Sequence, residues 1–180
     1  VGMLTPTIAH WLHPSIFSGL HFESMVDTAK FWIEYIRQNE RPDLIIGLFH
    51  SGLQGGITTT NYAENETLQV AQEVAGFDVI FYGHDHQLFR QTITNTEGNQ
   101  VLLLNPSSNG RFIAEVTVRS GHIKGRLINI EHEPVSQSFI NRFTPEFEEV
   151  RNFVNRKIAT FHTPIRTRDC YFGNSAFCDL

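Results

Sequence analysis

Three histidines stand directly after two apolar runs in this sequence, and imidazole is a common metal ligand. His50 follows the run 44–49, and His84 and His86 follow the run 79–82. Short apolar runs that end near glycine indicate buried strands, and α/β folds place their chemistry in the loops after such strands. Imidazole suits zinc, iron, nickel and copper. The sequence therefore predicts that these three side chains meet as metal ligands at one edge of a sheet.

The elements that would position these histidines alternate between helix and strand, which indicates an α/β fold. A helix over 24–38, which Ser24 could cap, precedes a strand at 43–49, and a helix over 64–75 precedes a strand at 78–82. Because residues two apart on an extended segment point the same way, the rings of His84 and His86 are expected to face one direction. Short strands are expected near 89–94, 101–104, 111–119 and 122–131, with a hairpin turn at Ser120-Gly121.

Several loop residues are candidates for contacts around the predicted metal site. The Gly- and Thr-rich segment 51–60 is expected to be a loop that lines a substrate pocket. The side chain of Asp85 is expected to turn away from the ligands, where it either supports them by hydrogen bonds or faces solvent, and Asn65 is interpreted as a helix cap. Asn105, Asn109 and Arg111 follow a buried leucine run, so they either bind a phosphate or ribose at the metal edge or form a plain turn. The other histidines are expected to be structural or on the surface: His10, His13, His21, His122, His132 and His162.

Composition excludes some classes of function. The net charge of −5 with no basic run argues against a nucleic-acid-binding surface. No apolar stretch is long enough to span a membrane, and no signal peptide is visible. The two cysteines, Cys170 and Cys178, lie far from the three candidate ligands in the sequence and do not form a C-x-x-C pattern, so buried or free thiols are favoured over a disulfide.

The pattern resembles the second half of a calcineurin-like metallophosphoesterase, in the branch of 5'-nucleotidases and 2',3'-cyclic-nucleotide 2'-phosphodiesterases. The resemblance rests on Val1-Gly-Met-Leu-Thr-Pro, on residues 43–52 with His-Ser-Gly, and on Ala63-Glu-Asn-Glu leading into residues 76–86 with Gly-His-Asp-His. It covers roughly residues 1–130. It implies a hydrolase of nucleotides or other phosphate esters with two divalent ions (zinc, manganese or iron), in which His50 and His84 serve one ion and His86 the other.

The resemblance also implies that this chain is a fragment. The family's Asp-x-His, Gly-Asp and Gly-Asn-His motifs are absent from the sequence. The N-terminal half of a parent enzyme is therefore the expected partner, and it would supply the remaining ligands. Alone, the chain is expected to hold one ion or none and to be inactive. A periplasmic or secreted location is implied by the family only.

The family fold is an αββα sandwich, with mixed sheets and flanking helices, and this chain would supply half of it. Both predicted central strands are apolar on both faces, whereas the two helices can cover only one face. The other face, expected to carry Ile46, Leu48, Ile80 and Leu103, would need a partner sheet or self-association. The expected division is 1–134 for the second half of the phosphoesterase domain, 135–162 for a linker region with a helix at 145–159, and 163–180 for the start of a C-terminal nucleotidase-type domain.

A different class of function stays open: a non-catalytic metal-binding or interaction module. A purely structural metal site would need a fourth ligand, and no further Cys or His stands near the three histidines in the sequence. An Asp-x-His and a Gly-Asn-His motif upstream of Val1 in the parent reading frame would favour the enzyme.

Overall fold

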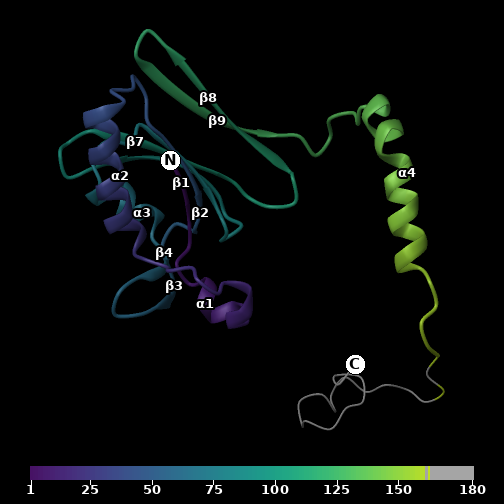
Figure 1. The fold of residues 1–180 in the computed structure, drawn as a ribbon. Coiled ribbons are helices and arrows are strands. Elements are labelled where there is room, and N and C mark those ends of the chain that lie inside the picture. The colour runs from purple at the N-terminus through teal and green to yellow at the C-terminus, as the bar shows by residue number, and fades with distance from the viewer. Residues whose placement is uncertain (161, 163–180) are drawn as a thin grey trace. The chain divides into compact units, whose positions relative to one another are not determined.

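The computed structural model describes residues 1–160 and 162, and they form two units. The first unit runs from Val1 to Glu133 and the second begins at Pro134. The first unit is built on one sheet with strand order β1-β2-β5-β7-β6 (Figure 1). The bounds are β1 Gly2–Leu4, β2 Ile46–His50, β5 Val79–Gly83, β7 Gln100–Pro106 and β6 Leu88–Thr94. The first four strands are parallel and β6 is antiparallel, so the predicted mixed sheet is confirmed.

Two helices cover one face of this sheet. Helix α2 (Met25–Asn39) begins as expected at Ser24, whose hydroxyl accepts the amide of Asp27 at 3.4 Å. Helix α3 (Thr67–Glu73) is shorter than predicted. Both helices pack against buried side chains of the sheet such as Phe49, Ile80 and Leu103. The main core therefore lies between the helices and the parallel strands.

Helix α3 starts late because the residues before it form a small second sheet. Strand β3 (Gly55–Thr58) pairs antiparallel with strand β4 (Ala63–Asn65). The segment 51–60 is therefore partly a strand, which corrects the expectation of a loop. Asn65 does not cap the helix, because its side-chain oxygen accepts the amide of Gly52 at 2.7 Å instead. These strands bring residues 55–65 to the end of β2.

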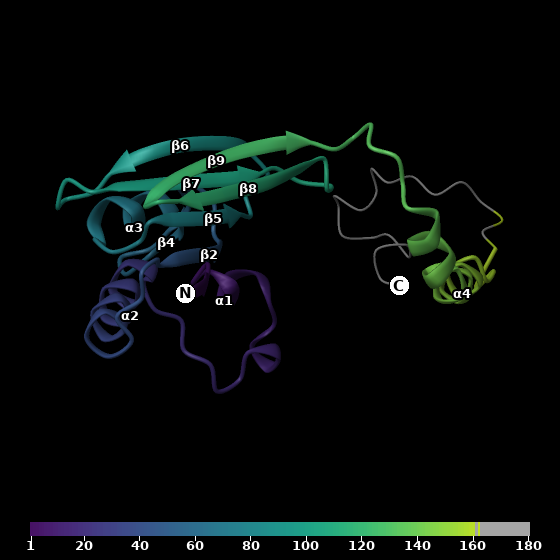
Figure 2. The ribbon, with the colours of Figure 1, turned by 90° about the horizontal axis from the view of Figure 1, so that it is seen from above.

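A long hairpin covers part of the other sheet face. Strands β8 (Phe112–Arg119) and β9 (His122–Asn129) are joined at Ser120 and Gly121, whose φ angles of 48° and 77° suit a tight hairpin turn. The predicted hairpin is thus confirmed. It runs alongside β7 and β6 (Figure 2) and packs on Val79, Leu102 and Leu104.

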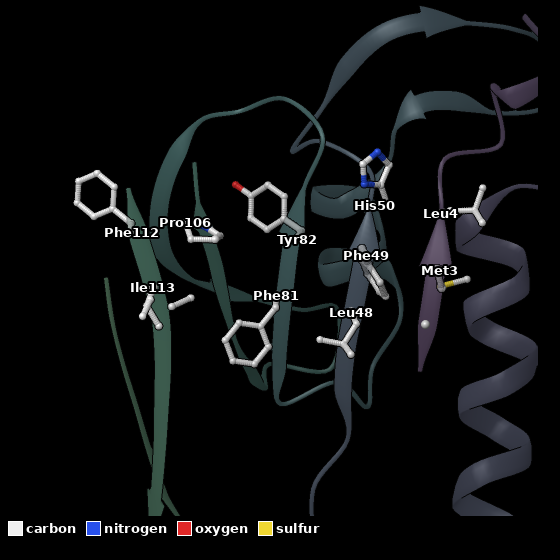
Figure 3. Close-up of a pocket in the computed structure, with 12 residues that line it drawn as sticks. Met3, Leu4, Leu48, Phe49, His50, Phe81, Tyr82, Pro106, Phe112 and Ile113 are labelled. Atoms are coloured by element: carbon white, nitrogen blue, oxygen red, sulfur yellow. The ribbon is translucent and has the colours of Figure 1, made fainter. Parts of the chain in front are cut away.

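The rest of this face is apolar and exposed. Leu4, Ile46 and Leu48 are 51%, 36% and 61% exposed. Leu4 and Leu48 border a cavity of about 660 Å³ that is also lined by Phe81 and by Ile113 of the hairpin (Figure 3). The predicted bare face therefore exists at Ile46 and Leu48.

Two residues expected on the bare face lie on the opposite one. Ile80 and Leu103 are fully buried in the core beneath the helices. Ile80 pairs with Gly47 and Leu103 pairs with Ile80, and residues that pair across strands share a face. They therefore face the same side as Phe49, two residues from Gly47, whereas Leu48 faces the other side.

The second unit contains helix α4 (Gln137–Val154). It starts eight residues before the predicted helix at 145–159. The reason is that Ser136 caps it: the Ser136 hydroxyl accepts a hydrogen bond from the backbone amide of Phe139 at 3.4 Å. Pro145 lies inside the helix rather than at its start. The predicted division at 134 and 162 and the roles given to its parts stay predictions. The expected nucleotidase-type segment 163–180, with Cys170 and Cys178, lies outside the described residues. None of the described helices is long and apolar enough to cross a membrane.

Candidate metal centre

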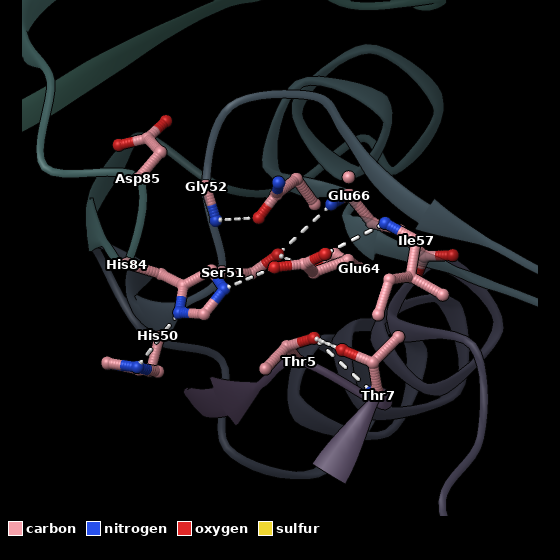
Figure 4. A network of polar contacts seen from close by, with 12 residues as sticks. Thr5, Thr7, His50, Ser51, Gly52, Ile57, Glu64, Glu66, His84 and Asp85 are labelled. Carbon is pink, nitrogen blue, oxygen red and sulfur yellow. Dashed lines mark hydrogen bonds and ion pairs between the residues drawn. The ribbon is translucent and has the colours of Figure 1, made fainter. Parts of the chain in front are cut away.

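Two of the three predicted ligands meet at the carboxyl edge of the sheet. Strands β2 and β5 are parallel, and His50 pairs with Gly83. His50 and His84, which follows Gly83, therefore lie next to each other at the ends of the two strands. The Nε2 atom of His50 lies 3.3 Å from the Nδ1 atom of His84 (Figure 4). The ring centroids are 5.0 Å apart. This much of the predicted convergence is present in the structure.

His86 does not join this pair. It is exposed, and its φ of 58° and that of His84, 93°, are both in the left-handed region. The His84–His86 segment is therefore not extended, and the expectation that both rings face one way for that reason is wrong. Within residues 1–160 and 162, no three His, Cys, Asp or Glu side chains are grouped closely enough to hold a metal ion. Ligation by His86 stays a prediction.

Glu64 is the residue of this site that sequence reasoning missed. Its Oε1 atom lies 2.8 Å from Nε2 of His84, and its Oε2 atom accepts the backbone amide of Ile57 at 2.8 Å. The side chains of His84 and Glu64 are only 19% and 17% exposed. The hydrogen bond from Ile57, followed by that from His84, lowers the pKa of the Glu64 carboxyl below its ordinary value. Glu64 is therefore an ionised, partly buried partner of His84.

The Glu64 carboxylate determines which ring nitrogen of His84 carries no proton. An ionised carboxylate can only accept a hydrogen bond, so the proton of neutral His84 lies on Nε2. Its Nδ1 atom then carries the lone pair that faces His50. Without a metal, the Nε2–H of His50 can donate to that lone pair.

The two imidazole nitrogens are donors that suit a metal ion. The facing atoms, Nε2 of His50 and Nδ1 of His84, lie 3.3 Å apart, so both could ligate the same ion. A histidine ligand also commonly donates its second ring N–H to a carboxylate, as His84 does to Glu64. The two histidines would fill two positions of such an ion.

Asp85 ties the loops of the site together instead of facing the histidine pair. Its carboxylate accepts hydrogen bonds from the backbone amide of Leu53 at 2.8 Å, the side-chain amide of Asn105 at 2.7 Å and the backbone amide of Gln87 at 3.2 Å. It therefore supports the loop after β5, and support of the histidine ligands by Asp85 stays a prediction.

The three candidate substrate residues have different surroundings. Asn105 is fully buried, and its amide is bonded at both ends, to Asp85 and to the backbone of Ser107. Asn109 and Arg111 are exposed in the connection between β7 and β8. The geometry thus gives Asn105 a structural role, and substrate binding by all three stays a prediction.

An aromatic side chain from the N-terminal segment borders the site. Trp11 ends the short helix α1 (Ile8–Trp11), and its ring centroid lies 5.3 Å from that of His84. It is 43% exposed. No spacing in the sequence pointed to this contact, because Trp11 and His84 lie far apart in the chain and α1 follows β1, which pairs with β2.

This fold is that of the calcineurin-like phosphoesterases. The crystal structure of the calcineurin-like phosphoesterase YfkN of Bacillus subtilis superposes with a TM-score of 0.66 at 22% identity, over 87% of this chain and 52% of that one. A Staphylococcus aureus protein described as a "putative 5'-nucleotidase", solved with alpha-ketoglutarate, also gives a TM-score of 0.66, at 14% identity over 96% of this chain and 34% of that one. The resemblance found in the sequence is thereby confirmed.

Two curated relatives carry related names. The trifunctional nucleotide phosphoesterase protein YfkN of Bacillus subtilis is 22% identical over 165 residues, which are 87% of this chain and 11% of the relative. A 2',3'-cyclic-nucleotide 2'-phosphodiesterase/3'-nucleotidase of Yersinia enterocolitica is 29% identical over 89 residues, which are 49% of this chain and 13% of the relative. The chain therefore spans a small part of the length of both. No family model matches the chain.

Proposed function

We propose that this chain is part of a metal-dependent hydrolase of phosphate esters, of the 5'-nucleotidase or 2',3'-cyclic-nucleotide phosphodiesterase type. The observation that carries the proposal is the 3.3 Å approach of His50 Nε2 to His84 Nδ1 at the ends of two parallel strands. The names of the relatives, which are nucleotide phosphoesterases, support the substrate class.

In the proposed site, His50 and His84 hold one divalent ion and His86 contributes to a second, with zinc, manganese or iron as candidates. Such an ion, when bound, polarises a phosphoryl oxygen and lowers the pKa of its water. The exposed side chains of Asn109 and Arg111 would bind the substrate, because a guanidinium pairs well with phosphate oxygens. Asn105 would contribute to substrate binding indirectly, because its hydrogen bonds to Asp85 and Ser107 hold the loop after β7 in place.

The proposed partner is the N-terminal half of the parent enzyme. The exposed apolar face at Leu4, Ile46 and Leu48 supports this, because a soluble protein seldom leaves such a face bare. Self-association through the same face is the alternative. A periplasmic or secreted location is proposed on the family resemblance alone.

A second candidate function is a non-catalytic metal-binding or interaction module. The observation in its favour is that the described residues contain no group of three metal ligands. A domain that lacks catalytic ligands would still show the histidine pair.

Metal titration of the chain separates these proposals from a plain hydrogen-bonded histidine pair. Calorimetric titration with Zn²⁺ and Mn²⁺ is expected to show binding that weakens at least tenfold in His50→Ala and in His84→Ala. His122→Ala, in the β8–β9 hairpin, is the matched control and should bind as the wild type does. Equal binding by all four proteins would contradict the proposed ligands.

Hydrolysis assays separate the enzyme from the module. We expect the chain alone to turn over bis-p-nitrophenyl phosphate and nucleotides negligibly, and to gain activity when the N-terminal half of the parent is added. A chain that reaches about 1–10³ turnovers per second by itself would contradict the need for that half. A full-length parent that binds metal but hydrolyses no phosphate ester would favour the module.

A further inference from the structure

We propose that Glu64 is a positioning residue for His84: its carboxylate accepts the Nε2–H and thereby fixes the tautomer whose Nδ1 lone pair faces His50. The proposal rests on the function above in one respect only: the lone pair on Nδ1 is taken to bind a metal ion. The orientation itself follows from two contacts, the 2.8 Å separation of Nε2 and Oε1 and the 3.3 Å separation of the two imidazole nitrogens.

Contacts with Ile57, Ser51 and Gly56 hold Glu64 in place. The amide of Ile57 donates to Oε2 at 2.8 Å, and the hydroxyl of Ser51 donates to the Glu64 carbonyl at 3.0 Å. Ser51 directly follows His50, so the backbone of Glu64 is anchored beside the first histidine (Figure 4). Gly56 completes the cradle, because a Cβ at that position would overlap the Glu64 carboxylate.

Glu64 does not face the space between Nε2 of His50 and Nδ1 of His84. It bonds Nε2 of His84, whereas the atom that faces His50 is Nδ1. The imidazole ring therefore connects the carboxylate to the proposed ion. This is the arrangement in which a carboxylate orients a histidine ligand, and loss of such partners typically lowers metal affinity about 10–100-fold.

The amide of Ile57 makes the consequence of Glu64→Gln specific. A backbone N–H can only donate, so the glutamine must turn its oxygen toward Ile57. Its NH₂ group then points at Nε2 of His84, which must accept. The proton of His84 is thereby moved to Nδ1, where it blocks the nitrogen that faces His50. Glu64→Ala removes the partner altogether and leaves a mixture of the two tautomers.

The experiment reads the ring nitrogens of His84 directly. ¹⁵N NMR of the metal-free chain, at a pH well above about 6.5 so that imidazole is neutral, is expected to show the Nε2–H tautomer in the wild type. Glu64→Gln should show the Nδ1–H tautomer, and Glu64→Ala a mixture. The matched control is Glu73→Gln, which removes a charge from a glutamate on α3 that bonds Lys30 and Gln69. It should leave the His84 signals unchanged.

Zinc titration of the same four proteins gives the second reading. We expect Glu64→Gln and Glu64→Ala to bind Zn²⁺ about 10–100-fold more weakly than the wild type, and Glu73→Gln to bind equally well. Reversal of the tautomer by Glu64→Gln separates positioning from a general loss of structure, which would not select one nitrogen.

The outcomes for Glu64 and for the metal site are distinguishable. A wild-type His84 with its proton on Nδ1, or a Glu64→Gln variant that keeps the wild-type tautomer, would overturn the positioning role. If the tautomers change as expected but neither the wild-type chain nor its complex with the N-terminal half of the parent binds metal, the positioning role stands and the proposed hydrolase site fails.

Discussion

Alanine at Gly56 should cost far more stability than alanine at its neighbour Gly55, although the two backbones are alike. The φ angles are 79° at Gly56 and 85° at Gly55, in the region that disfavours a side chain. A Cβ at position 55 meets nothing within 4 Å. A Cβ at position 56 meets the Glu64 carboxylate, with its Cδ at 2.8 Å, and Nδ2 of Asn65 at 2.9 Å. The pair therefore separates backbone strain from the contact with Glu64.

The magnitudes follow from these contacts. The left-handed backbone costs a residue with a Cβ roughly 1–2 kcal/mol, and both variants carry that term. In Gly56→Ala the carboxylate must also move away from the Ile57 amide and from His84, and hydrogen bonds to a charged group contribute about 1.5–3 kcal/mol. We expect Gly55→Ala to lose about 1–2 kcal/mol of unfolding free energy and Gly56→Ala, which adds the loss of one such hydrogen bond, about 2.5–5 kcal/mol.

Urea unfolding of both variants measures the difference, and ¹⁵N NMR of His84 shows its cause. Gly56→Ala should shift His84 away from the Nε2–H tautomer, and Gly55→Ala should not. Equal losses of stability in the two variants, with unchanged His84 signals, would refute the reasoning that Gly56 is required by the position of Glu64.

Three further predictions test the packing around the site. Leu103→Ala, in the core under the helices, should lower the unfolding free energy by about 2–5 kcal/mol, whereas Leu48→Ala on the exposed face should change it by at most about 0.5 kcal/mol; similar losses would mean that Leu48 is covered. Asp85→Ala should cost roughly 2–4 kcal/mol, because it leaves the amides of Leu53 and Asn105 without their acceptor; urea unfolding measures it, and a loss below about 1 kcal/mol would show that the loops hold without this carboxylate. Light scattering should detect self-association of the chain that Leu48→Glu reduces; a wild type that stays monomeric at all concentrations would show that the apolar face tolerates water.

The strands and the positions of His50 and His84 could be predicted from the sequence because their signals are local. The apolar runs before His50 and His84 mark buried strands, and parallel strands bring their ends to one edge. Ser24 and the Ser120-Gly121 turn are likewise defined by short-range chemistry. These features need no knowledge of distant contacts.

The remaining parts of the site depend on contacts between residues far apart in the chain. Glu64 lies 20 residues from His84, and its role appears only when β3 pairs with β4 and turns the carboxylate toward the ring. The sheet face on which Ile80 and Leu103 lie follows from the strand register, and a continuous apolar run does not reveal that register. The direction of His86 depends on a positive φ at a residue other than glycine, which the sequence does not signal.

The exposed sheet face and the histidine pair are adjacent, and this has a thermodynamic consequence. His50 lies on the same side of β2 as Leu48 and lines the same cavity. A segment that covers this face therefore ends beside His50, and if it brings a further metal ligand, docking and metal capture share one equilibrium. The factor by which the ion tightens docking then equals the factor by which docking tightens the ion. If the proposed N-terminal half is that segment, a chelator added to the assembled protein would weaken its docking by that same factor.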